Sequence, residues 1–274
     1  MRLKYFGRTG RKVSEIGMGT YYDPLWIATA FFGWRRGASA KVEAIRAGLD
    51  LGITLVDTAE IYRSEPLVAK ALDGRRRDET FLATKVWPNH VRGDSLVRAF
   101  NGSLRRLSTS YIDLYQVHWP NPTVPIKDTM VAMEQLVDEG KLRHIGVSNF
   151  NLKQIQEAQS ALPKSELSSV QLDYSLIHRN IEPEILPYCE SEGIALLAYY
   201  PLGHGKLPND ARLEKMSSGN GRTKAQIALR WLAGKPNVFP IPRASNSEHV
   251  IDNAKAGDWE LPDGDRQELD LRFR

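Results

Sequence analysis

The chain has 274 residues, of which 42% are hydrophobic and 26% charged, which is typical of a globular protein. Its 37 basic and 33 acidic residues leave a net charge of +4, which is compatible with an anionic ligand but too small to indicate a nucleic-acid partner. The N-terminus lacks the apolar core of a signal peptide, and no apolar run reaches the roughly 20 residues that span a bilayer. The only cysteine, Cys189, excludes an intramolecular disulfide and favours a reducing compartment. We therefore expect a cytoplasmic protein with no membrane or nucleic-acid partner.

Short apolar runs alternate with helical patterns along the chain. The first residues predict a β-hairpin that turns between Gly7 and Gly10 and covers the floor of the fold. Helical spacing of apolar residues predicts, among others, helices over 95–107, 127–140 and 223–236. Apolar runs predict eight strands, at residues 14–19, 53–57, 81–85, 113–118, 144–148, 168–173, 194–199 and 238–242.

Eight strands, each followed by a helix, are the arrangement of a (β/α)8 TIM barrel, so the predicted class is α/β. A doubly wound open sheet is the alternative, but the GxGxxG fingerprint of dinucleotide-binding sheets is absent after the first strand. The chain contains no linker and no low-complexity segment. We therefore predict a single barrel domain over residues 1–274.

Four polar residues lie at or just after successive predicted strands. Asp57, Lys85 and His118 end the second, third and fourth strands, and Tyr62 follows Asp57 by five residues. Each has an ordinary explanation, such as a helix cap, a surface charge or a half-buried aromatic. In a TIM barrel, however, the carboxyl ends of all strands meet on the face that carries the active site. We therefore expect the four side chains to lie together.

These four residue types suit proton transfer to an oxygen atom. A tyrosine ordinarily has a pKa near 10 and needs its phenolate stabilised to act near neutral pH. The Lys85 ammonium would lower the pKa of Tyr62, and Asp57 would keep Lys85 charged. His118 could polarise a carbonyl oxygen beside the phenol, so the group predicts a site for developing alkoxide charge.

The later strand ends carry groups that suit a flat, phosphorylated ligand. Ser148 and Asn149 follow the fifth strand, Gln171 lies in the sixth, and Tyr199 at the end of the seventh could stack on a planar ring. After the eighth strand, Arg243 precedes Ser245 and Glu248, whose spacing predicts a capping box. A helix N-terminus beside an arginine is a candidate phosphate site, although simple capping without a ligand is the other interpretation.

Together these motifs resemble the aldo-keto reductase family along nearly the whole chain. The motifs are MGT (18–20), GITLVDTAEIY (52–62), ATK (83–85), QVHWP (116–120), GKLRHIGVSNF (140–150), VQLDYS (170–175), AYYPLG (198–203) and AQIALRW (225–231). The resemblance implies a nicotinamide-dependent reductase of aldehydes and ketones, with a catalytic tetrad of Asp57, Tyr62, Lys85 and His118 and with Tyr62 as proton donor. A histidine rather than a glutamate at 118 favours carbonyl reduction over the reduction of steroid double bonds.

The resemblance also implies the cofactor site. It assigns Ser148, Asn149 and Gln171 to the carboxamide, Tyr199 to the nicotinamide ring, and Leu202 and Gly203 to the pyrophosphate. The remaining cofactor-binding residues that it implies are Gly19, Thr20, Asp57, Arg243, His249 and Asn253. Many family members carry lysine and arginine where this chain has Arg243 and His249, and a histidine is mostly neutral at pH 7. We therefore expect NADPH, with NADH also possible.

The segment 21–39 is longer and more aromatic than the family pattern. Tyr22, Trp26, Phe31, Phe32 and Trp34 could roof the substrate pocket, or they could form an oligomer contact. Besides Tyr62 and His118, the residues predicted to contact a small carbonyl substrate are Trp26, Trp87 and Trp119. The oligomeric state is not predicted.

Two other functions compete with carbonyl reduction. A non-catalytic, cofactor-binding regulatory subunit of the same fold is the first, but the tetrad is intact. A barrel hydrolase is the second, but the fourth and seventh strands end in His118 and Tyr199 rather than in a glycosidase's carboxylate pair. The six histidines show no metal-ligand spacing in the sequence, so no metal site is predicted.

Overall fold

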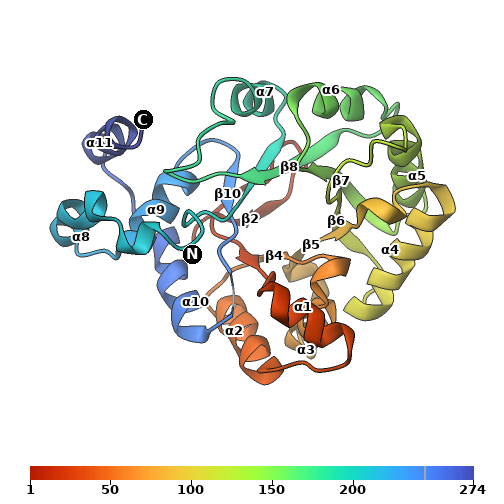
Figure 1. Ribbon diagram of the computed structural model, residues 1–274, viewed down its shortest axis with the longest axis horizontal. Helices are drawn as coiled ribbons and strands as arrows, with labels where there is room; N and C mark the ends of the chain where they lie inside the picture. The colour runs from red at the N-terminus through yellow and green to blue at the C-terminus, as the bar shows by residue number, and fades with distance from the viewer. Residues whose placement is uncertain (244) are drawn as a thin grey trace.

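The computed structural model describes residues 1–243 and 245–274, and its centre is a ring of eight parallel strands (Figure 1). In order around the ring, the strands are β3 (Met18–Gly19), β4 (Leu55–Asp57), β5 (Phe81–Val86), β6 (Ile112–Val117), β7 (Leu142–Ser148), β8 (Leu167–Asp173), β9 (Ala195–Tyr199) and β10 (Val238–Pro240). Backbone hydrogen bonds of 2.9 Å from Gly17 N to Pro240 O and from Gly19 N to Pro242 O join the two ends. The predicted (β/α)8 barrel is therefore confirmed.

Helices cover the outside of the ring (Figure 1). Those that follow the strands are α2 (Ala38–Asp50), α3 (Glu65–Leu72), α4 (Gly93–Leu107), α5 (Ile126–Asp138), α6 (Leu152–Ser160), α7 (Ile185–Ser191), α9 (Lys224–Ala233) and α10 (Ser247–Ala254). Additional helices are α1 (Pro24–Phe31), α8 (Glu214–Asn220) and α11 (Asp263–Arg272). Short 3₁₀ turns are η1 (Glu60–Tyr62), η2 (Arg77–Glu79), η3 (Pro88–His90), η4 (Leu207–Asn209), η5 (Ala211–Leu213) and η6 (Lys255–Gly257).

Helix α4 illustrates why these segments are helical. Its buried residues Leu96, Phe100 and Leu107 recur at helical spacing and face the sheet. Asp94 lies in the first turn and Arg105 and Arg106 lie in the last, where each charge opposes the helix dipole. The sequence prediction of a helix over 95–107 was therefore accurate to within two residues.

The N-terminal hairpin closes the bottom of the barrel, as predicted. It pairs β1 (Leu3–Tyr5) with β2 (Lys12–Ser14) in antiparallel register. The ring of Phe6 lies 4.7 Å from that of Phe81 and 5.0 Å from that of Phe239, inside the barrel. Gly7 follows at a φ of 53°, and a Cβ there would approach Gly193 O to 2.5 Å, so the turn requires glycine.

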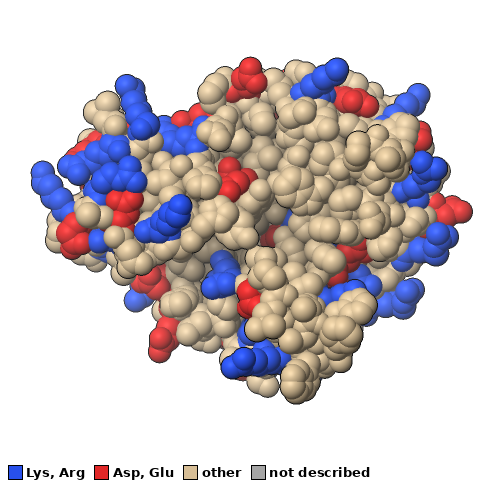
Figure 2. All heavy atoms as spheres, viewed as in Figure 1, with Lys and Arg blue, Asp and Glu red and all other residues tan. Residues whose placement is uncertain are grey.

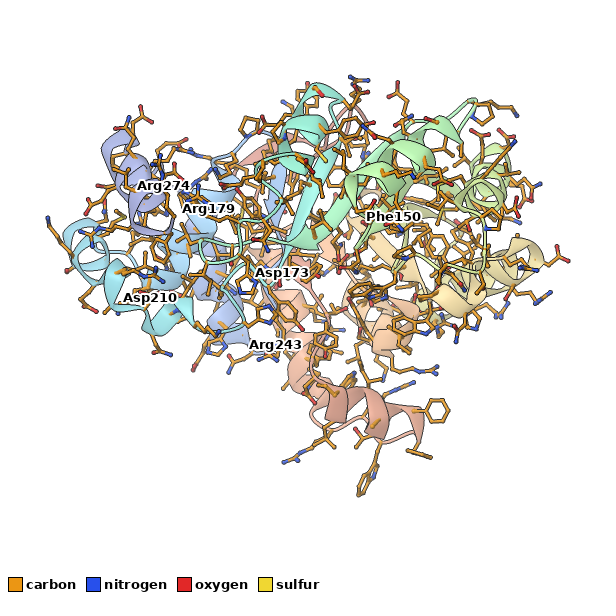
Figure 3. All side chains as sticks on the ribbon, turned by 45° about the horizontal axis from the view of Figure 1, so that its top comes forward. Phe150, Asp173, Arg179, Asp210, Arg243 and Arg274 are labelled. Carbon is orange, nitrogen blue, oxygen red and sulfur yellow. The ribbon has the colours of Figure 1, made fainter. Side chains whose placement is uncertain are left out.

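The segment after β3 differs from expectation because half of it is helical. Asp23 accepts a hydrogen bond of 2.7 Å from Trp26 N, and Pro24 occupies the first helical turn, so the two residues start α1. Figure 3, turned by 45° from Figure 1, shows this helix standing out from the body of the protein. An Asp-Pro pair before a helix is a start signal that the sequence analysis did not use.

Charged side chains lie mainly around the edge of the face seen in Figure 2, whereas most atoms around its central hollow belong to uncharged residues. Among the described residues, no helix is both long and apolar enough to cross a membrane.

Candidate active site

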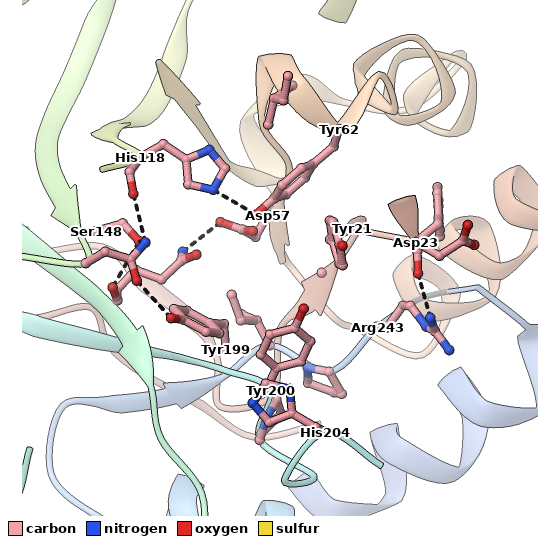
Figure 4. A pocket seen from close by; sticks show the side chains of 18 of the residues that line it. Tyr21, Asp23, Asp57, Tyr62, His118, Ser148, Tyr199, Tyr200, His204 and Arg243 are labelled. Atoms are coloured by element: carbon pink, nitrogen blue, oxygen red, sulfur yellow. Dashed lines mark hydrogen bonds between the residues drawn. The ribbon is translucent and has the colours of Figure 1, made fainter. Parts of the chain in front are cut away.

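A cleft of about 780 Å³ opens at the carboxyl ends of the barrel strands (Figure 4). Asp57 ends β4, Ser148 ends β7 and Tyr199 ends β9, and all three line this cleft. His118 immediately follows β6, and Tyr62 ends η1. The strand ends therefore converge as the barrel topology requires.

Asp57 and Lys85 form a buried ion pair beneath the cleft. The Lys85 ammonium, which is fully buried, donates a hydrogen bond of 2.6 Å to Asp57 Oδ2 and another of 2.9 Å to Thr58 O. Burial lowers the pKa of Lys85, and the Asp57 carboxylate counteracts this effect. Gln171 Nε2 donates to the other Asp57 oxygen at 2.9 Å, so both carboxylate oxygens are bonded.

Tyr62 and His118 lie in contact at the wall of the cleft. The Tyr62 hydroxyl lies 3.3 Å from His118 Nε2, and the Lys85 ammonium lies 4.9 Å from the centre of the Tyr62 ring. Trp87 packs edge-on against the His118 ring at 5.4 Å. The tetrad predicted from separate strands is thus one connected group.

The protonation of this group differs from the sequence-based expectation in one respect. We expected Lys85 to lower the pKa of Tyr62, but burial, followed by the Asp57 charge, raises that pKa well above its ordinary value. Burial also lowers the pKa of His118 to about 3, assisted by the charge of Lys85. The phenol therefore keeps its proton at neutral pH, and the imidazole is neutral.

A hydrogen-bonded network lines the adjoining wall. Asn149 Nδ2 donates to His118 O at 2.8 Å and to Ser148 Oγ at 3.1 Å. The Tyr199 hydroxyl donates to Asn149 Oδ1 at 2.8 Å, and Ser148 Oγ donates to Gln171 O at 3.0 Å. Asn149 has a φ of 62°, a left-handed conformation that asparagine tolerates better than most residues. The network fixes these amide and hydroxyl groups at the edge of the cleft.

The first strand and the segment after β9 contribute backbone. Gly19 and Leu202 line the cleft, whereas Thr20 is fully buried and donates to Asp57 O at 3.0 Å. Gly203 has a φ of 59°, and a Cβ there would meet the Ile177 side chain at 2.5 Å. Thr20 and Gly203 therefore hold neighbouring segments in position rather than face the cleft.

Arg243 lies at the far end of the cleft, where its Nη1 donates to Tyr22 O at 2.6 Å (Figure 4). His249 and Asn253 lie on α10, outside the cleft lining as far as the structure describes it. The helix cap is one residue later than predicted, because Asn246, not Ser245, accepts a hydrogen bond from Glu248 N, at 2.7 Å. Asparagine is as favourable an N-cap residue as serine, so the Ser245–Glu248 spacing could not identify which of the two residues caps the helix.

The predicted aromatic roof is only partly present. Tyr22 lines the cleft, but Phe31, Phe32 and Trp34 are exposed to solvent and lie outside its lining. Trp26 is only 4% exposed and donates from Nε1 to Tyr62 O at 3.1 Å, so it supports the Tyr62 backbone instead of reaching the cleft. Helix formation caused part of the difference, because at 3.6 residues per turn Trp26 and Phe31 point to different sides of α1, whereas Phe32 and Trp34 come after its end.

Trp87 and Trp119 line the cleft as expected. Sequence reasoning missed Tyr21, Tyr200 and His204, which also line it. The Tyr21 ring lies 5.2 Å from that of Tyr62 and 6.4 Å from that of Tyr200. Tyr200 lies within the AYYPLG motif and the other two lie next to recognised motifs, but nothing in their spacing indicates which way they point.

The sequence profile of the aldo/keto reductase family matches residues 16–271. A methylglyoxal reductase of Escherichia coli is 36% identical over 88% of each chain, and a glyoxal reductase of Bacillus subtilis is 33% identical over 89% of this chain and 87% of its own. The crystal structure of an aldo/keto reductase from Klebsiella pneumoniae with NADP and acetate matches all of this chain and 96% of its own, with a TM-score of 0.88 and 34% identity.

The chain therefore belongs to the aldo/keto reductase family. It is an oxidoreductase that reduces aldehydes or ketones with a nicotinamide cofactor.

Proposed function

We propose that the protein reduces small aldehydes, including 2-oxoaldehydes, with NADPH, and that Tyr62 is the proton donor. The observation that carries this proposal is the 3.3 Å contact between the Tyr62 hydroxyl and His118 Nε2, in a cleft underlain by the Asp57–Lys85 ion pair. A carbonyl oxygen placed beside the phenol and the imidazole, within reach of both, would meet two hydrogen-bond donors at once. Such a pair stabilises the negative charge that develops on that oxygen.

The cofactor supplies a hydride to the carbonyl carbon, and the chain's residues supply the rest. Tyr62 transfers its hydroxyl proton to the carbonyl oxygen, which completes the alcohol. The phenolate that remains lies above the Lys85 ammonium, 4.9 Å from the ring centre, so the charge left by the proton is compensated. His118, being neutral, donates a hydrogen bond without competing for that proton.

The chain offers groups that fit NADPH along the whole cleft. Ser148, Asn149 and Gln171 offer amide and hydroxyl partners for a carboxamide, and Tyr199 offers an aromatic face. Gly205 lines the cleft with a φ of 83°, and a Cβ there would meet nothing within 4 Å, so a phosphate group can approach the backbone. The Arg243 guanidinium supplies the positive charge for the 2′-phosphate.

The substrate class is inferred from relatives and from the cleft. Two relatives are named as methylglyoxal and glyoxal reductases. Around Tyr62 and His118 the cleft wall is aromatic, with Tyr21, Trp87 and Trp119. An apolar wall with few polar groups suits a compact carbonyl compound. Because the matched relatives are reductases, the regulatory-subunit alternative is not pursued.

The decisive experiment replaces Tyr62 by phenylalanine. Tyr62→Phe should lower kcat for methylglyoxal by about 100-fold or more, because the proton donor is lost, while the Kd for NADPH changes little. Loss of NADPH absorbance measures turnover, and quenching of protein fluorescence measures cofactor binding. Tyr115→Phe is the matched control, because it removes a buried hydroxyl that has no partner among the described residues. Retention of most activity by Tyr62→Phe would refute the assignment of the proton donor.

A panel of carbonyl compounds tests the substrate class. Methylglyoxal and glyoxal should give higher kcat/KM values than bulky ketones of similar reactivity, because the aromatic wall favours compact molecules. Equal kcat/KM values across the panel would refute the proposed preference while leaving carbonyl reduction intact.

A further inference from the structure

Three potential metal ligands meet beside the cleft although they are distant in the sequence. Asp173 ends β8, His178 lies in the turn that follows, and His204 lies in the segment after β9. Asp173 Oδ2 is 3.2 Å from His178 Nδ1 and 2.8 Å from His204 Nε2. The ligating atoms of the three residues all lie within 4.8 Å of one another.

The cluster is held by its surroundings. Ser175 and His178 exchange two backbone hydrogen bonds of 3.1 Å, which fix the turn that carries His178. The His204 ring packs 3.9 Å from that of Tyr200 and 5.1 Å from that of His178 (Figure 4 labels Tyr200 and His204). The two imidazoles are thus brought together by two different loops.

The bonding of Asp173 is incomplete without a further partner. Its ion-pair partners among the described residues are the two histidines, and its Oδ1 is buried without a hydrogen-bond partner among those residues. A buried acceptor left unpaired costs about 1–3 kcal/mol. A cation bound by both oxygens of this carboxylate would remove that cost, because Oδ1 would then have a partner as well as Oδ2.

The donor set matches one class of cation. Two imidazole nitrogens and one carboxylate suit borderline divalent transition ions such as Zn²⁺ rather than Mg²⁺ or Ca²⁺, which prefer oxygen. Tetrahedral Zn²⁺ needs donor atoms about 3.3 Å apart, and the distances of 3.2 and 2.8 Å from Asp173 Oδ2 to the two imidazoles are close to that value. The imidazole nitrogens lie within 4.8 Å of each other, and partly exposed histidines can adjust this distance by rotating. The side chains of His178 and His204 are 37% and 40% exposed.

We propose that Asp173, His178 and His204 bind a divalent transition-metal ion such as Zn²⁺. The bound ion links the end of β8 to the segment after β9, in which Tyr200 and His204 line the cleft. Both of these residues have a positive φ, of 47° and 54°. The ion therefore stabilises a conformation of the cleft wall that is otherwise strained.

Metal titration of the untagged protein tests this proposal. Isothermal titration with Zn²⁺ should give one equivalent bound with micromolar affinity, and Co²⁺ should produce the visible absorption bands of a tetrahedral complex. The melting temperature should rise with Zn²⁺ concentration, because the ion binds only the folded chain at this site. Absence of binding would overturn the proposal.

Variants locate the ion. His178→Ala and His204→Ala should each weaken Zn²⁺ binding by about 100-fold. His178→Gln is a second variant that keeps the side-chain bulk. His90→Ala is the matched control, because His90 is also an exposed histidine paired with a carboxylate, that of Glu60 at 3.0 Å, and it should leave binding unchanged. Retention of full affinity by the double variant His178→Ala/His204→Ala would overturn the assignment.

Discussion

At the scale of single residues, the Asp57–Lys85 pair is where we expect stability and catalysis to be connected. Both side chains are almost inaccessible to solvent, and their 2.6 Å contact offsets the cost of burying two charges. Removing one partner leaves the other charge uncompensated. We propose that the pair holds a positive charge under Tyr62, and we expect the stability of the fold to depend on both partners.

A double-mutant cycle separates these two roles. Lys85→Met should lower the free energy of unfolding by about 3–5 kcal/mol, because Asp57 stays buried without its cation. It should also reduce kcat by about 100-fold or more, since the phenolate loses its compensating charge. Urea denaturation and steady-state assays measure the two effects.

The double variant Asp57→Asn/Lys85→Met is the control for this cycle. It removes both charges, so most of the stability should return while the activity stays low. Recovery of activity along with stability would mean that Lys85 has no role beyond structure.

Arg243 is the second residue whose role can be isolated. Arg243→Ala should raise the KM for NADPH by about tenfold or more and change the KM for NADH by less than about twofold, because only NADPH carries the 2′-phosphate. Arg243→Lys should fall between, since lysine keeps the charge without the bidentate geometry. Equal changes in the KM for NADPH and for NADH would mean that Arg243 acts through its contact with Tyr22 O and not through the 2′-phosphate.

At the scale of elements, the N-terminal hairpin and helix α1 have different roles. The hairpin contributes a core residue, Phe6, to the bottom of the barrel, at the end away from the cleft. Helix α1 leaves its last aromatics exposed, yet its start supports the cleft through Asp23 and Trp26. The first element is therefore structural, and the second positions the Tyr62 turn.

Truncation of Phe6 tests the structural role of the hairpin. Phe6→Ala should lower the free energy of unfolding by about 3–5 kcal/mol, because it empties the space between Phe81 and Phe239. The KM and kcat at 25 °C should stay close to those of the wild type. Tyr5→Ala at the preceding position is the control, since Tyr5 is 58% exposed and its loss should cost little. Equal destabilisation by both variants would contradict the packing argument.

At the scale of the whole molecule, one buried and one partly buried histidine should make stability depend on pH. Burial lowers the pKa of His118 to about 3 and that of His144 to about 4. In the unfolded chain a histidine binds its proton near pH 6.5. Between these values the unfolded state holds more protons, so the free energy of unfolding should fall as the pH falls from about 6.5 towards 4.

At pH 5 each histidine should lower the free energy of unfolding by about 1–2 kcal/mol relative to pH 7.5. Urea denaturation at pH 7.5 and 5 measures it, and His144→Asn should flatten the dependence. An identical urea midpoint at the two pH values would contradict the lowered pKa values of His118 and His144.

We also propose that residues 1–274 form one domain. Circular dichroism and tryptophan fluorescence should therefore report a single coincident unfolding transition.

The barrel was predictable because the pattern of apolar residues along the chain follows the burial of each strand and helix. A run such as residues 81–85 is apolar because both faces of a parallel strand are covered, and the structure has β5 at Phe81–Val86. The convergence of Asp57, Tyr62, Lys85 and His118 was also predictable, because a closed parallel barrel brings the carboxyl ends of its strands to one face. The expected cytoplasmic location stays a prediction.

The direction and partners of loop side chains were decided by tertiary structure alone. Trp26 was expected in the substrate pocket but lies beneath the Tyr62 turn, because helix α1 turns it inward. The burial that raises the pKa of Tyr62 depends on every neighbouring loop at once. His178 and His204 are 26 positions apart in the sequence. They meet because the strands that precede them, β8 and β9, are adjacent in the barrel. Local patterning thus determined the strands and the polar side chains that meet at the cleft, whereas contacts between loops depend on packing that no local pattern encodes.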